Sequence, residues 1–119
     1  MNQYSPDFDF TPIQTASADI DNILYELVDY VKKFKCPPEL DFYTNTKDGL
    51  VLLNNEKNRP FIDQLRKFAG LWTRLARVQT YGCEELEDKH MATATAIERA
   101  LFRMKEYQLR LYDECTGAH

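Results

Sequence analysis

Two helical periodicities joined by a Tyr81-Gly82 turn constrain this chain more than any other feature. From residue 60 to 80, and again from 84 to 113, mostly apolar side chains recur at steps of three or four. That spacing places each series on one face of a helix, and a short turn makes the two helices antiparallel neighbours. The series are Phe61, Leu65, Phe68, Trp72, Leu75 and Val78, then Leu86, His90, Ala94, Ile97, Leu101, Met104, Gln108 and Leu111. We therefore expect a long helical hairpin with Trp72 buried in its core.

A further helix is predicted from near Ser17 to Lys35. Ser17 suits the N-cap, because its hydroxyl can accept a hydrogen bond from an N–H of the first turn. Pro37-Pro38 prevents the helix from continuing. Its apolar face comprises Ile20, Ile23, Leu24, Leu27, Val28, Val31 and Phe34. The expected fold is an all-α antiparallel three-helix bundle.

The length and composition indicate a single domain. With 119 residues and 44% hydrophobic content, the chain has room for one core. We expect an N-terminal arm at 1–16, a helical bundle domain at 17–113 and a tail at 114–119. Aromatic residues alternate with acids in the arm, which suits docking either on its own domain or on a partner. Between the first two helices, residues 40–53 fit a short β-hairpin, a helical turn or irregular structure, and the last two are slightly preferred.

The charges are distributed unevenly. The formal net charge is -4, and the first 30 residues contain acids but no lysine or arginine. This balance argues against a nucleic-acid partner, because proteins that bind nucleic acids carry a dominant basic surface. The predicted helix from 60 to 80 is locally basic, which suits an acidic protein surface or the chain's own acidic segment. Its basic residues are Arg66, Lys67, Arg74 and Arg77.

The compartment follows from what the chain lacks. No apolar run approaches the roughly 20 residues that span a bilayer, and the N-terminus has no secretory-signal pattern. The three cysteines show no CxxC spacing, which fits reduced thiols. We therefore expect a cytoplasmic protein with no membrane partner, present as a monomer or a homodimer.

Glu87 and His90 form the one pattern with a possible metal chemistry. Glu-x-x-His projects both side chains to the same side of a helix, as in ferritin-like di-metal bundles. Such sites need two copies of the motif, and this chain has one, so only a symmetric dimer would complete the site. Nucleotide-binding, zinc-protease and nucleophile-elbow motifs do not occur. We expect no metal, no cofactor and no enzymatic activity.

From Pro60 to Leu101 the order of residues resembles the BAG domain, a three-helix bundle of co-chaperones. The stretch Ile20–Leu27 is similar to the opening helix of that fold, so the resemblance covers residues 19–104. It implies a surface on the last two helices that binds the ATPase domain of the heat-shock chaperone. The matching residues are Phe61, Leu71-Trp-Thr-Arg-Leu75, Val78-Gln-Thr-Tyr-Gly82, Leu86, Lys89 and Ile97-Glu98.

The chain departs from the BAG pattern at its chaperone-contact residues. Ala76 stands where the family has an aspartate, and His90 stands where it has an arginine. Losing such charges from an interface typically costs several kcal/mol. The resemblance therefore implies a relative that has lost or changed the standard partner.

Together these features predict a non-enzymatic protein–protein interaction module, a diverged BAG-like co-chaperone adaptor whose partner is a chaperone or an acidic protein surface. One alternative is a metal-binding, ferritin-like dimer that uses Glu87 and His90. Another is a viral or phage accessory protein that inhibits a host factor. The predicted partner-binding residues are Arg66, Lys67, Arg74, Arg77 and Glu98.

Overall fold

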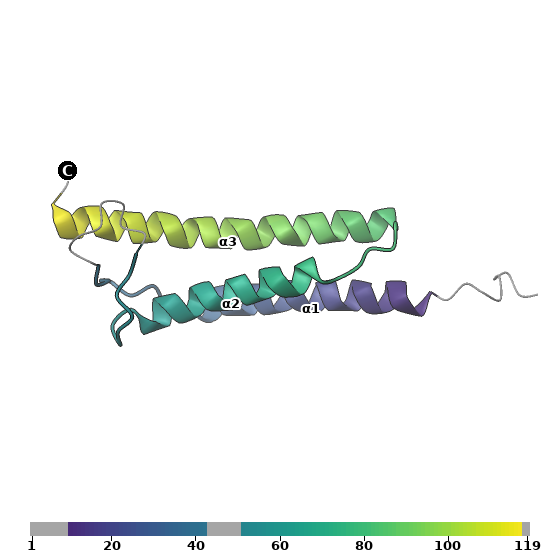
Figure 1. Ribbon diagram of the computed structural model, residues 1–119, viewed down its shortest axis with the longest axis horizontal. Coiled ribbons are helices and arrows are strands. Elements are labelled where there is room, and N and C mark those ends of the chain that lie inside the picture. The colour runs from purple at the N-terminus through teal and green to yellow at the C-terminus, as the bar shows by residue number, and fades with distance from the viewer. Residues whose placement is uncertain (1–9, 43–50, 118–119) are drawn as a thin grey trace, which may run out of the picture.

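The computed structural model describes residues 10–42 and 51–117 and confirms the all-α antiparallel three-helix bundle. Its helices are α1 (Thr11–Lys33), α2 (Arg59–Ala76) and α3 (Glu84–Thr116), and each packs against the other two. The chain runs in the same direction along α1 and α3 and in the opposite direction along α2 (Figure 1). Within the described residues, no helix is long and apolar enough to cross a membrane.

Phe61, near the start of α2, is a fully buried member of the core with 0% exposure. Its ring centroid lies 6.4 Å from that of Phe34 and 6.3 Å from that of Tyr107, so aromatic side chains from three segments meet there. The Tyr107 hydroxyl donates a hydrogen bond of 2.6 Å to the Pro37 carbonyl. This contact ties the chain leaving α1 to α3. The other fully buried apolar side chains are Ile20, Ile23, Phe68, Leu71, Leu75 and Ile97.

The predicted start of α1 near Ser17 is wrong, because the helix begins at Thr11. Pro12 occupies the first turn, where a missing N–H costs no intrahelical hydrogen bond. The extra turns are held by packing, since Ala16 is buried in the core. Ser17 instead accepts a hydrogen bond of 2.9 Å from the Lys89 ammonium on α3. Much of the predicted arm at 1–16 is therefore helix, and residues 1–9 lie outside the described residues.

The predicted burial of Trp72 is also wrong, because this side chain is 40% exposed. The face of α2 that meets its neighbours is rotated toward Gln64 and Leu71, which are both buried. Periodicity in the sequence missed this face because Gln64 is polar. Its amide donates a hydrogen bond of 3.1 Å to the Tyr30 carbonyl near the end of α1, so its burial leaves no polar group unpaired.

The hairpin turn between α2 and α3 lies at the predicted Tyr81-Gly82. Both residues have left-handed backbone angles, with φ of 53° at Tyr81 and 68° at Gly82. However, α2 ends at Ala76 and not near residue 80, because the Leu75 carbonyl accepts the N–H of Val78 and so closes the last turn tightly. At the other end, α3 continues to Thr116, beyond the predicted domain limit at residue 113, and Gly117 caps it with φ of 67°.

The connection from α1 to α2 is organised by Asn58, whose side chain has 0% exposure. Its Oδ1 accepts the Asp41 N–H at 2.8 Å, and its Nδ2 donates to the carbonyls of Asp41 and Leu53 at 2.7 Å each. Phe42 and Leu52 form an isolated antiparallel bridge beside this site. The bridge favours the hairpin over the helical turn at the ends of 40–53, while residues 43–50 lie outside the described residues.

Acid should destabilise this connection through Asp41. A hydrogen bond from Asn55 (2.8 Å) and the Lys57 ammonium (3.3 Å) lower the pKa of the Asp41 carboxyl. A lowered folded-state pKa contributes stability above the unfolded pKa of about 3.9, and this contribution is lost as pH falls through the folded-state pKa. In urea titrations from pH 7 to pH 2, Asp41→Asn should therefore show a shallower acid loss than wild type. If the free energy of unfolding fell equally with acid in wild type and Asp41→Asn, this role of Asp41 would be contradicted.

Candidate protein-binding surfaces

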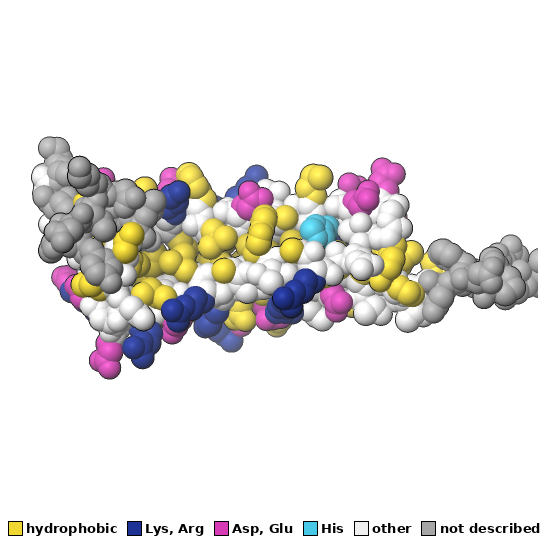
Figure 2. Space-filling view, in the orientation of Figure 1, with side chains coloured by type: hydrophobic (Ala, Val, Ile, Leu, Met, Phe, Trp, Pro, Cys, Tyr) yellow, Lys and Arg dark blue, Asp and Glu magenta, His cyan; other side chains and the backbone are white. Residues whose placement is uncertain are grey.

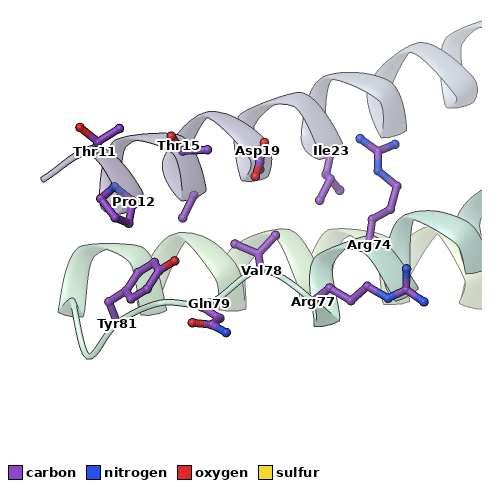
Figure 3. A pocket seen from close by; sticks show the side chains of 11 residues that line it. Thr11, Pro12, Thr15, Asp19, Ile23, Arg74, Arg77, Val78, Gln79 and Tyr81 are labelled. Atoms are coloured by element: carbon purple, nitrogen blue, oxygen red, sulfur yellow. The ribbon is translucent and has the colours of Figure 1, made fainter. Parts of the chain in front are cut away.

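A polar cleft of about 630 Å³ lies between the first half of α1 and the end of α2. In Figure 3, α1 forms one side of this cleft, and the segment from Arg74 to Tyr81 forms the other. The cleft brings together two of the predicted partner-binding residues, Arg74 and Arg77. Asp19 also lines it, so acidic and basic groups share its walls.

Arg74 is already engaged within the bundle. Its guanidinium forms an ion pair of 2.8 Å with Glu26 on α1, and Glu26 accepts a hydrogen bond of 3.1 Å from the Tyr30 hydroxyl. Desolvation and the bond to Glu26 raise the pKa of Tyr30, so its phenol stays protonated. One basic residue of α2 thus pairs with the acidic N-terminal part of the chain, which is one of the two expected uses of this basic helix. Arg77 is exposed and forms no ion pair with any described residue.

Of the other predicted partner-binding residues, Lys67 borders the same Tyr30–Glu26 pair that Arg74 contacts. The Lys67 ammonium is 5.2 Å from the centre of the Tyr30 ring, in a cation–π arrangement. Arg66 is exposed on α2, and Glu98 is exposed on α3. Figure 2 shows basic side chains spaced along the edge of the bundle and not gathered into one patch. The structure therefore places Arg74 and Arg77 in one cleft and Lys67 beside the Tyr30–Glu26 pair that Arg74 contacts, while Arg66 and Glu98 have no described contact with this group.

His90 belongs to α3, and its imidazole contacts the last turn of α2. Its Nε2 is 2.8 Å from the Leu75 carbonyl, and because a carbonyl only accepts, this nitrogen donates the hydrogen bond. Glu87 is exposed. Among the described residues, no three histidine, cysteine or acidic side chains gather closely enough to hold a metal. The bond to Leu75 holds the imidazole against the last turn of α2.

An apolar groove of about 580 Å³ runs between α1 and α3. Three aliphatic side chains of α1, one helical turn apart, line it and remain partly exposed: Leu24 (39%), Val28 (44%) and Val31 (49%). Opposite them, Ala96 and Ala100 of α3 present small side chains. Phe68 of α2 contributes to the lining from the core.

The charged residues of this groove share one sign. Its lining includes Lys32 of α1 with Arg99 and Arg103 of α3, and it includes no aspartate or glutamate among the described residues. None of the three forms an ion pair with a described residue. The groove is therefore locally basic, although the chain as a whole has a net charge of -4.

This groove was not predicted, although its signal is present in the sequence. The apolar residues of α1 cover roughly 140° of the helix at about 100° per residue, which is wider than one narrow seam needs. The core covers the half that carries Ile20, Ile23 and Leu27. The other half, with Val28 and Val31, has no covering helix among the described residues. The width of the apolar arc on α1 would have indicated a second interface, which the helical period alone does not show.

No protein-family model, curated protein sequence or solved structure matches this chain.

Proposed function

We propose that this protein is a non-enzymatic protein–protein interaction module that binds a helical segment of a partner in the groove between α1 and α3. The observation that carries the proposal is the exposed row of Leu24, Val28 and Val31 facing Ala96 and Ala100. An amphipathic helix that lies in a groove inserts anchor side chains at this same spacing, so its apolar face can pack along the row. Small residues allow a helix to approach to about 8 Å between axes.

The described residues favour binding over catalysis. The polar cleft contains an arginine that is already paired, and the imidazole of His90 is held by a backbone carbonyl. Desolvation raises the pKa of the Cys36 thiol despite its surface position, which lowers its reactivity at neutral pH. All three cysteines carry free thiols, so we place the module in the cytoplasm.

Replacing Val28 by lysine should abolish partner binding without unfolding the bundle. The change puts a charge in the apolar lining, at a side chain already 44% exposed. Immobilised wild type should retain a partner from a lysate of the source cells, and Val28→Lys should reduce its recovery ten-fold or more, about 1.4 kcal/mol per decade. Tyr25→Lys is the matched control, because Tyr25 is 75% exposed on α1 and lies outside the groove. Equal recovery by all three proteins, quantified by mass spectrometry, would contradict the proposed site.

The ATPase domain of the heat-shock chaperone should bind weakly or not at all. Ala76 offers no charge at the end of α2, and one nitrogen of the His90 imidazole is already bonded to the Leu75 carbonyl. Calorimetric titration of that ATPase domain tests this expectation. Tight binding would support the BAG-like co-chaperone alternative and would move the interface to α2 and α3.

A further inference from the structure

We propose that the occupant of the α1–α3 groove is an acidic amphipathic helix that lies antiparallel to α1 and α3, with its acidic residues in its N-terminal half. This inference rests on the proposed function and adds the charge and the direction of the bound helix. Its basis is the joint placement of an open apolar row and three basic side chains in one groove.

The direction follows from the arrangement of the bundle. Because α1 and α3 run the same way and α2 runs against them (Figure 1), a helix between α1 and α3 would complete an up-and-down four-helix arrangement by running antiparallel to both. Its N-terminus would then lie near the C-terminal end of α1, where Lys32 and Cys36 line the groove. The groove spans α3 from Ala96 to Tyr107, roughly 16 Å or three helical turns at about 1.5 Å per residue.

The charge follows from the basic side chains of the groove, of which Lys32 and Arg103 lie toward that end. Lys32, Arg99 and Arg103 are the charged lining residues, and no described acid neutralises them by an ion pair. Acidic residues in the first turns of a helix are also favoured by its own dipole. Acidic residues near the N-terminus of the bound helix would therefore interact favourably with the dipole of that helix and with the basic side chains of the groove. Complementary charge of this kind selects partners and speeds association.

A second copy of this chain fits the groove less well. Two copies that present the same face to each other would bring together two sets of the same three cations with no lining acid between them. Like charges at an interface disfavour association. A separate acidic helix meets no such repulsion.

A displayed library of 18-residue amphipathic helices tests the charge. Leucine is fixed at groove-facing positions, and each flanking position encodes glutamate or lysine. Selection on the full chain should return peptides with glutamate in the N-terminal half, and exchanging these for lysine should weaken binding at least ten-fold by fluorescence anisotropy. The double variant Arg99→Glu/Arg103→Glu should reverse the preference. Arg66→Glu is the matched control, because Arg66 is exposed outside the groove and its loss should change nothing.

Cys36 provides the test of direction. With Cys83 and Cys115 replaced by serine, a selected peptide carrying an N-terminal cysteine should form a mixed disulfide with Cys36 faster than the same peptide carrying a C-terminal cysteine. Glutathione disulfide is the oxidant, and it is reduced to two glutathione thiols as each disulfide forms. Equal or reversed rates would overturn the antiparallel placement.

The remaining outcomes separate this inference from the proposed function. The selected peptides could fail to bind Val28→Lys and yet show no preference for glutamate. That result would overturn the inference that the bound helix is acidic and would keep the groove as a binding site. Failure to recover any peptide sensitive to Val28→Lys would overturn both proposals. Concentration-dependent dimerisation in analytical ultracentrifugation, abolished by Val28→Lys, would identify a second copy as the occupant. Circular dichroism of each variant confirms that loss of binding is not loss of fold.

Discussion

Replacing Phe61 by alanine is expected to lower the free energy of unfolding by about 3–5 kcal/mol, the range for removing a large aromatic side chain from a core. Phe61 has 0% exposure and lies between the rings of Phe34 and Tyr107. Its removal leaves a cavity at the point where α2, α3 and the end of α1 meet. Urea denaturation followed by far-ultraviolet circular dichroism measures the change.

Trp72→Ala is the matched control for this prediction. Both residues are aromatic and both belong to α2, but Trp72 is 40% exposed. Its truncation should cost about 1 kcal/mol, typical of a substitution that creates no buried cavity. A loss for Trp72→Ala equal to that for Phe61→Ala would show that the packed face of α2 is the one predicted from periodicity.

Asn58→Ala is expected to cost about 3 kcal/mol or more. The substitution removes three hydrogen bonds and leaves the Asp41 N–H without its buried acceptor. The Asp41 and Leu53 carbonyls each keep one backbone donor, the N–H of Leu53 and the N–H of Asn55. Each lost hydrogen bond costs about 1 kcal/mol, and a buried N–H left unpaired costs about 1–3 kcal/mol, although water entering the site would recover part of this loss. The transition should remain cooperative, because Leu40 beside this site belongs to the core.

Asn54→Ala is the control for the Asn58 substitution. Asn54 is exposed and lies in the same connection, so its truncation should change the free energy of unfolding by less than about 0.5 kcal/mol. Asn58→Asp adds a second comparison, because it keeps the acceptor oxygen but loses the two donated bonds. It should be as damaging as alanine. A stable Asn58→Ala variant would show that the connection contributes little to the folded state.

The partner-binding surface was only partly predictable from the sequence. Basic residues on α2 were visible as a cluster in the chain, but their partners were not. Arg74 pairs with Glu26, and Lys67 lies over Tyr30, so both contribute to contacts within the bundle. These contacts join residues more than 35 positions apart, and no local pattern specifies them. The groove-lining Arg99 and Arg103 do not form a run in the sequence and became a group only beside Lys32.

The sequence by itself determined the number, order and direction of the helices. Apolar spacing marks each helix, Pro37-Pro38 and Pro60 limit the connection, and Tyr81-Gly82 forces the chain to reverse. These are local effects of side-chain period and backbone freedom, so they act in the same way in any context.

Only the tertiary structure decided which apolar side chains are covered. On α2, Gln64 and not Trp72 faces the neighbouring helices, because the Tyr30 carbonyl supplies the hydrogen bond that makes burial of an amide favourable. On α1, the apolar arc is wider than the bundle covers, so Val28 and Val31 stay exposed. Burial depends on what packs alongside each face, and helical period records only that a face exists.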